Sequence, residues 1–306
     1  MTNASRIPAF VNPESGTAEK ARDALERAGL FDVIEVKPAD LRDRIQETVA
    51  NGASRFLIAG GDGSIRTAVE VAAGTDVEMA VLPAGTLNHF VKDHRLPTDL
   101  DEAASIAAGP FTTTTDVGRV GEHLFHGTSS VGSYVSFMRT RERLEPRLGY
   151  RISSLLAFIW TFIRMPTITV EIEVEGERRI FRTPLLFVAV GERELQAPTL
   201  GGRIPDGKRG LHVMVVRGRR RARLFLVALD AFSNGVRKAA RSPEFDAFMV
   251  HRCSITMRRR RVRISFDGEA QTVDVPLEYQ FERDMLRLVV ADPSLRESEK
   301  ESDASR

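Results

Sequence analysis

The sequence predicts an α/β fold in two parts, an N-terminal doubly wound parallel sheet and a mostly β, sandwich-like second domain. Strand and helix signals alternate over the first hundred residues, and two glycine-bearing loops follow two of these strands. After about residue 112 the pattern changes to alternating polar and apolar residues. We expect domains at 1–112 and 113–293, with the last strand a candidate to return to the first domain, and a disordered tail at 294–306.

The first domain is predicted from short apolar runs and helical spacing. Strands are expected at 7–11, 31–36, 56–59 and 77–82. Apolar residues at helical spacing mark 18–28, 41–49 and 65–72, and Gly29 and Asn51-Gly52 end the first two helices. Ligands of such parallel sheets bind beyond the carboxyl ends of the strands.

The second domain is predicted mainly from strands. Residues 168–174 alternate and turn at Gly176, and further strands are expected at 185–190, 211–216, 262–266 and 286–290. Two helices are expected, around 152–163 and 222–238.

Composition excludes several classes of protein. The formal net charge of +2 does not describe a polycation directed at nucleic acid, and the single cysteine, Cys253, excludes a disulfide framework or a cysteine-rich metal site. The apolar stretch Ile152 to Ile163 is shorter than the roughly 20 residues that span a membrane. With no signal-peptide pattern at the N-terminus, we expect a soluble, cytoplasmic protein that contacts a membrane from one side.

The segment GGDGS, from Gly60 to Ser64, links a predicted strand to a predicted helix. Glycines bring backbone N–H groups close to phosphate oxygens, and a helix N-terminus favours the same anion. An aspartate in such a loop is suited to hold Mg²⁺, which prefers oxygen ligands. The alternative is a tight turn in which Asp62 only caps the helix.

A second loop, PAGTLNHF, follows the next strand, so both loops can face one crevice. Thr86 and Asn88 offer a hydroxyl and an amide for phosphate or ribose oxygens. The sequence contains neither GxxxxGK[ST] nor GxGxxG, which excludes an ordinary P-loop or dinucleotide site.

These motifs, in this order, resemble the catalytic family of diacylglycerol kinases, which includes bacterial lipid kinases and sphingosine kinases. The resemblance rests on Asn12-Pro13-x-Ser15-Gly16, GGDGS, PAGTLNHF, Asp116-Val117-Gly118 and Phe266-Asp267-Gly268-Glu269. It covers roughly residues 7 to 290. GGDG also occurs in NAD kinases and phosphofructokinases, whose fold the first domain would share.

The resemblance implies ATP and Mg²⁺ as cofactors and a lipid hydroxyl as phosphate acceptor. It places ATP along the loops of the first domain, at Asn12, Ser15, Gly16, Gly60, Gly61, Asp62, Gly63, Ser64, Gly85, Thr86 and Asn88. Asp62 and Asp116 are the implied metal residues. His89 and Lys208-Arg209 stand where the family often has acidic residues, which puts an additional structural Mg²⁺ in doubt.

By the same resemblance, Asp267 is the base and Glu269 assists it. Phosphoryl transfer needs mainly positioning and charge neutralisation, plus a carboxylate that accepts the hydroxyl proton. In a continued strand Glu269 would share a face with Asp267, so either could be the base. The alternative for Asp267-Gly268 is a plain hairpin turn.

Three further features bear on partners. Five arginines lie between Arg217 and Arg223 and five between Arg258 and Arg263, suited to an anionic membrane surface or to solvation alone. The helix at 152–163 is expected either in the core or against lipid. His123 and His126 are expected at the surface of a hairpin rather than at a metal.

The sequence therefore predicts an ATP-dependent lipid kinase, with no nucleic-acid partner and with the oligomeric state open. The alternatives are a kinase of a soluble substrate such as NAD and a catalytically weakened lipid-binding protein. The identity of the lipid is not encoded in these motifs.

Overall fold

The computed structural model describes residues 6–164, 167–196, 199–204, 206–216, 245–292 and 294. The chain divides into two compact units, one formed by Gly118–Phe281 and the other by Met1–Val117 together with Glu282–Arg306. The chain passes from one unit to the other within two strands, β5 (Thr112–Val120) and β18 (Leu277–Val289). The first of these boundaries therefore follows residue 117, whereas the sequence predicted a domain boundary after residue 112. Beyond Ser294, the predicted tail lies outside the described residues.

The first unit is built on a parallel sheet. Its strands β1 (Ile7–Val11), β2 (Phe31–Glu35), β3 (Arg55–Gly60) and β4 (Glu78–Pro83) are arranged in the order β2-β1-β3-β4. All of these pairs are parallel, and the second half of β18 continues the sheet in parallel beside β4. The predicted parallel sheet is confirmed.

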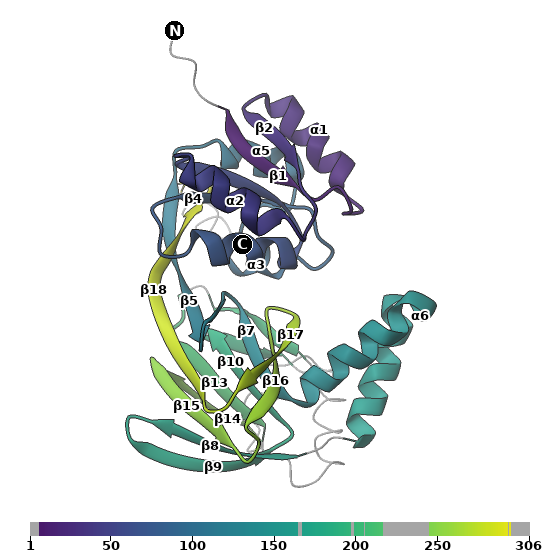
Figure 1. Ribbon diagram of the computed structural model, residues 1–306, viewed down its shortest axis with the longest axis vertical. Helices are drawn as coiled ribbons and strands as arrows, with labels where there is room; N and C mark the ends of the chain where they lie inside the picture. Colours follow the sequence, from purple (N-terminus) through teal and green to yellow (C-terminus); the bar gives the residue numbers. More distant parts are fainter. Residues whose placement is uncertain are drawn as a thin grey trace, which may run out of the picture. The chain divides into compact units, whose positions relative to one another are not determined.

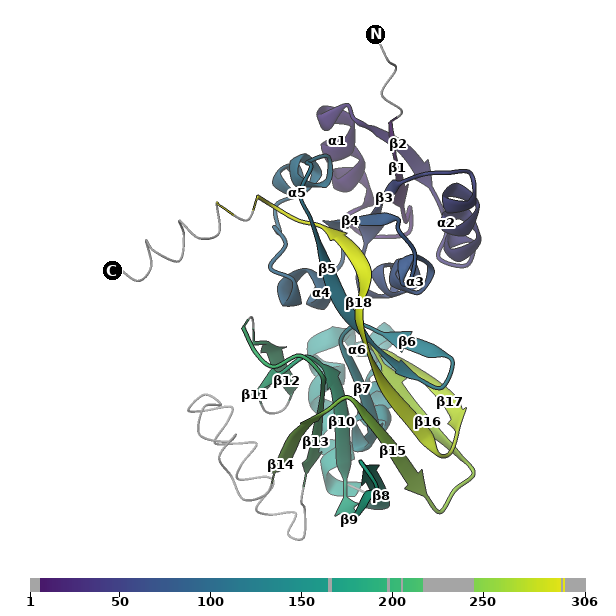
Figure 2. The same ribbon diagram turned by 90° about the vertical axis from the view of Figure 1, so that its left-hand side faces the viewer.

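Helices cover both faces of this sheet (Figures 1 and 2). On one face, α1 (Ala18–Ala28) and α5 (Leu100–Ala107) pack through Leu25 and Ala104 onto Leu57 and Leu82. On the other face lie α2 (Leu41–Ala50) and α3 (Asp62–Ala72), and the short helix α4 (His89–Asp93) follows β4. Gly29 ends α1 in the left-handed conformation, as the sequence pattern predicts.

The second unit is a sandwich of two antiparallel sheets. One has the order β14-β13-β10-β7-β16-β17, and the other continues from the first half of β18 through β15 and β8 to β9. The strands are β6 (His123–Phe125), β7 (Thr128–Gly132), β8 (Ile168–Val174), β9 (Glu177–Thr183), β10 (Leu185–Val190), β13 (Leu211–Val216), β14 (Phe245–Val250), β15 (Arg252–Met257), β16 (Arg261–Phe266) and β17 (Glu269–Asp274), with a separate pair β11 (Arg193–Gln196) and β12 (Thr199–Arg203). Buried Val188 and Ile264 of one sheet share a core with Ile172 and Ile255 of the other. The predicted β-rich sandwich is confirmed.

Helix α6 (Ser133–Arg164) is longer than the helix predicted at 152–163. It consists of two helical stretches, because Gly149 has φ 70° and ψ 166° and breaks the helical path between them. Within the described residues, none of the helices combines the length and the apolar character that crossing a membrane requires. The helix predicted at 222–238 lies outside the described residues.

Candidate functional site

Three loops meet at the carboxyl ends of β1, β3 and β4 in the first unit. The Ala84 N–H donates to the carbonyl oxygen of Gly60 over 3.1 Å. The hydroxyls of Ser15 and Thr17 both donate to the Ala84 carbonyl, over 2.8 and 2.6 Å. Ala84 therefore ties the loop after β1 and the GGDGS loop to the loop after β4.

Glycine is required where these loops touch. A Cβ atom on Gly85 would lie 2.4 Å from the Gly61 Cα, and one on Gly60 would lie 2.6 Å from the Ser64 Cβ. The two loops thus pack backbone against backbone, which no residue with a side chain permits without a shift. Gly63 beside them is exposed.

The GGDGS loop ends at a helix N-terminus that no side chain caps. Gly61 is the N-cap residue of α3, in an extended conformation, and Asp62 is the first helical residue. Uncapped N–H groups at a helix N-terminus form an anion site together with the helix dipole. The geometry is therefore suited to a phosphate, which stays a prediction for this loop.

Asp62 and Asn88 connect the loops to the following helices. The Asp62 Oδ1 accepts a hydrogen bond from the Phe90 N–H of α4 over 3.2 Å. Asn88 has φ 49°, and its Oδ1 accepts from the Gly85 N–H over 3.1 Å. Asp62 is half-buried, while Thr86 and His89 are exposed.

The residues predicted in the first loop have two kinds of role. The Asn12 Oδ1 accepts from the Glu14 N–H over 3.0 Å, and the Ser15 hydroxyl is engaged with Ala84. These two side chains hold the loop in shape. Gly16 is exposed, and the space around its Cα is open.

The two predicted metal carboxylates have different environments. Asp116 in β5 is 2% exposed, and its Oδ1 accepts from the Asp284 N–H over 3.1 Å, which ties β5 to β18 within the first unit. Among the described residues, no group of three or more His, Cys, Asp or Glu could hold a metal ion. Mg²⁺ commonly binds through one or two carboxylates plus substrate phosphates and water, so the half-buried Asp62 at the uncapped N-terminus of α3 fits this ion.

In the second unit, Asp267 and Gly268 form the two-residue turn between β16 and β17. Both have positive φ, 47° and 88°, as in a type I′ hairpin, and Phe266 pairs with Glu269 across the turn. The expectation that Glu269 continues the strand of Asp267 is wrong, because the chain reverses between them. Glu269 is exposed at the start of β17.

The carboxylate of Asp267 is fixed by three consecutive backbone N–H groups. Its Oδ1 accepts from Gly127 and Thr128 over 2.8 and 3.0 Å, and its Oδ2 accepts from His126 over 2.8 Å. The side chain is 1% exposed. The structure thus joins Asp267 to the segment from His126 to Thr128, at the start of β7.

Two residues near Asp267, His126 and Arg193, were not predicted there; a Cβ added to Gly127 would lie 2.9 Å from the Asp267 Oδ1 and 3.8 Å from the Arg193 Nη2. The His126 Nε2 lies 3.5 Å from the Asp267 Oδ2 and its side chain is 5% exposed, so the expectation of a surface histidine is wrong for His126. Arg193 is buried, and its backbone N–H donates a hydrogen bond to the Nδ1 of His212. Burial is the main cause that lowers the pKa of His212. The sequence signal that could have indicated a buried His126 is its position directly before Gly127.

This chain combines a parallel α/β unit, with glycine-bearing loops at its strand ends, and a β-sandwich unit. Solved structures named as bacterial diacylglycerol kinases share this fold. A putative diacylglycerol kinase from Bacillus anthracis superposes with a TM-score of 0.73 and 19% identity, covering 96% of this chain and 99% of that chain. A second such structure from the same organism gives a TM-score of 0.70 and 17% identity, with the same coverage.

Sequence comparison gives matches over part of the chain. Residues 6–120 match the diacylglycerol kinase catalytic domain, which confirms the predicted resemblance. A diacylglycerol kinase of Mycobacterium tuberculosis is 28% identical over 189 residues, 57% of this chain and 61% of that protein. A probable YegS-like lipid kinase of Pseudomonas putida is 31% identical over 142 residues, 45% of this chain and 47% of that protein. These alignments span less than two thirds of the relatives' length.

Proposed function

We propose that this protein is an ATP-dependent lipid kinase that transfers the γ-phosphate of ATP to the hydroxyl of diacylglycerol or a related lipid. The observation that carries the proposal is the meeting of three loops around Ala84, at the uncapped N-terminus of α3. The match of residues 6–120 to the diacylglycerol kinase catalytic domain supports the same chemistry.

The first unit is assigned the nucleotide. Backbone N–H groups of Gly61, Gly63 and Ser64 are offered to the ATP phosphates, while the exposed Gly16 and Thr86 line the approach. Mg²⁺, when bound with ATP, neutralises phosphate charge, and Asp62 is the carboxylate placed to hold it. Asp116 remains a second candidate, although its burial and its bond to Asp284 favour a structural role.

The second unit is assigned the carboxylates that act on the lipid hydroxyl. Three of the lone pairs of Asp267 already accept backbone N–H groups, and the side chain is buried. We therefore assign acceptance of the hydroxyl proton to the exposed Glu269. Asp267 is assigned the positioning of the segment from His126 to Thr128.

Peripheral contact with a membrane is supported by α6. Ile152, Leu156, Ile159 and Trp160 recur on one face of its second half and are 42–55% exposed. An exposed apolar stripe that includes a tryptophan is typical of helices that lie at a lipid–water interface. Arg258 to Arg263 add positive charge in the same unit, whereas Arg217 to Arg223 lie outside the described residues.

The nucleotide assignment is tested by two substitutions of Asp62. Asp62→Asn keeps an oxygen that can accept from Phe90, so the fold is preserved while the charge is lost; Asp62→Ala loses both. We expect each variant to lower transfer of labelled phosphate by at least about a hundredfold, with an unfolding midpoint close to wild type for Asn. Wild-type turnover of Asp62→Asn would remove Asp62 from the metal site and leave it only the contact with Phe90.

A further inference from the structure

The second unit contains a pocket that the proposed kinase reaction does not use. It has a volume of about 660 Å³, within the range of small-molecule sites. Its walls come from both sheets of the sandwich: Val131 of β7 and Val262 of β16 belong to one sheet, and Ile168 of β8 and Met257 of β15 to the other. The pocket is thus an opening into the core between the sheets, next to the first turns of α6.

The pocket lies far from the proposed catalytic carboxylates of the same unit. Arg258 and Arg259 precede β16, whereas Asp267 follows it. Because a strand rises roughly 3.4 Å per residue, the six residues of β16 separate the two ends by about 17 Å. A ligand in this pocket is therefore not at the reacting hydroxyl.

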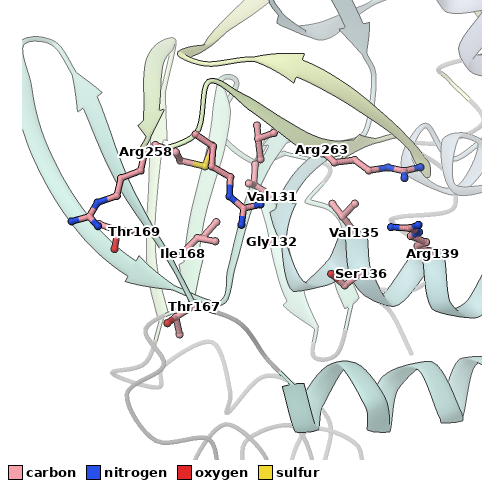
Figure 3. Close-up of a pocket in the computed structure, with 13 residues that line it drawn as sticks. Val131, Gly132, Val135, Ser136, Arg139, Thr167, Ile168, Thr169, Arg258 and Arg263 are labelled. Atoms are coloured by element: carbon pink, nitrogen blue, oxygen red, sulfur yellow. The ribbon is translucent and has the colours of Figure 1, made fainter.

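Two chemistries are combined in its lining. Val131, Val135, Ile168, Met257 and Val262 supply an apolar surface, and all five either belong to the buried core or are partly exposed beside it. The guanidinium groups of Arg139, Arg258, Arg259 and Arg263 add four positive charges, and no carboxylate lines the described part of the pocket. Figure 3 shows Arg258 on one side of the apolar residues and Arg139 and Arg263 on the other.

These four arginines have no anionic partner within the described residues. In the same hairpin, Arg261 pairs with Asp274 over 3.3 Å, but Arg139, Arg258, Arg259 and Arg263 form no ion pair or side-chain hydrogen bond. Four guanidinium groups around one pocket give it a positive potential that favours the binding of an anion. Guanidinium groups bind phosphate in a bidentate manner, so a phosphate is the anion that this arrangement fits.

We propose that this pocket binds a single phosphate-bearing lipid, with the phosphate at the arginines and an acyl chain on the apolar lining. A free phosphate would leave the apolar lining exposed to water, and a neutral lipid would leave four guanidinium groups without a counterion. The occupant is an anionic phospholipid of the membrane, held at a site separate from the substrate. The inference goes beyond the kinase reaction, and only the separation of the two sites rests on the proposed function.

The test is calorimetric titration of the full chain with a short-chain phosphatidate below its micelle concentration. Inorganic phosphate and the corresponding short-chain diacylglycerol are titrated in parallel. We expect saturable binding of the phosphatidate and at least tenfold weaker binding of phosphate alone. Arg258→Gln combined with Arg263→Gln should weaken phosphatidate binding at least tenfold, since both side chains are exposed and their loss leaves the fold intact.

The matched control is Arg178→Gln combined with Arg179→Gln, which removes two exposed charges from β9 of the same unit, outside the pocket. This variant should bind phosphatidate like the wild type. Ile168→Asn, in the apolar lining, should weaken the binding of phosphatidate without changing the binding of inorganic phosphate. Equal loss in both arginine variants, or unchanged binding in Arg258→Gln/Arg263→Gln, would overturn the proposal. Phosphate that binds as tightly as phosphatidate would overturn the assignment to a lipid.

Discussion

The carboxylate of Asp267, a residue predicted to be catalytic, holds the backbone of a neighbouring segment in place. Its bonds to the N–H groups of His126, Gly127 and Thr128 fix the start of β7 relative to the β16–β17 turn. A turn residue chosen only for its positive φ would not need this burial. The contacts separate positioning, at Asp267, from proton acceptance, which we assign to Glu269.

This division of roles predicts different losses in two isosteric variants. Glu269→Gln should lower kcat by at least about a hundredfold, with the unfolding midpoint unchanged, because the exposed carboxylate is needed only for the proton. Asp267→Asn turns an N–H₂ group toward backbone donors, which should cost about 1–3 kcal/mol of unfolding free energy. Kinetics and thermal unfolding of both variants distinguish the roles. A dead but fully stable Asp267→Asn, beside an active Glu269→Gln, would make Asp267 the base.

At the scale of elements, the proposed phosphate site depends on how three loops pack together rather than on one loop. Gly61 and Gly85 belong to loops more than twenty residues apart in the chain, yet their backbones are in contact. The hydroxyls of Ser15 and Thr17 add the third loop. A change at any contact should therefore affect all three loops.

Gly85→Ala tests this packing. The added methyl would lie 2.4 Å from the Gly61 Cα, so we expect a loss of about 1–3 kcal/mol of stability and much weaker ATP binding. Gly16→Ala is the matched control for stability, because no atom lies within 4 Å of its added Cβ. Chemical unfolding and ATP titration measure both. Equal stability of the two variants would show that the loops do not pack as described.

The apolar stripe on α6 predicts a second effect at this scale. The chain contains one tryptophan, Trp160, so its emission reports on this helix alone. Anionic vesicles should shift the emission to shorter wavelength, and neutral vesicles should do so less. Ile159→Asp should abolish the shift, whereas Ile180→Asp, on an exposed residue of β9, should not. An unchanged emission with vesicles present would argue against contact of α6 with lipid.

For the whole molecule, the sequence predicted most of the fold. Buried parallel strands such as Phe56 to Ala59 are continuous apolar runs, and helices of the first unit end at clear signals such as Gly29. The first half of α6 was missed because its exposed, charged face carries little periodic signal. The last strand was expected as a candidate to return to the first domain, and β18 pairs there with β4, about two hundred positions earlier in the chain, a partner that local pattern does not specify.

The sequence indicated which residues belong to the candidate site, but not the contacts that they make. The motifs identified Asp62, Gly85 and Asp267, because glycines and loop carboxylates mark strand ends in the sequence. The sequence indicated the cluster Arg258 to Arg263, but the pocket that these arginines line and the place of His126 beside Asp267 depend on tertiary packing. The roles of Ser15 and Asn12 in shaping a loop depend on hydrogen bonds that their sequence positions do not reveal.

The central claim, phosphate transfer from ATP to a lipid hydroxyl, is tested most directly with γ-labelled ATP and Mg²⁺. The acceptors would be diacylglycerol, a sphingoid base, ceramide, phosphatidylglycerol and NAD, with the lipids in mixed micelles. We predict that label moves into the organic phase with one of the lipids, and that Asp62→Asn, folded as the wild type, does not transfer it. Label found only in NADP, the phosphorylated form of NAD, would contradict the account. So would the absence of transfer to any acceptor by a folded protein that binds ATP.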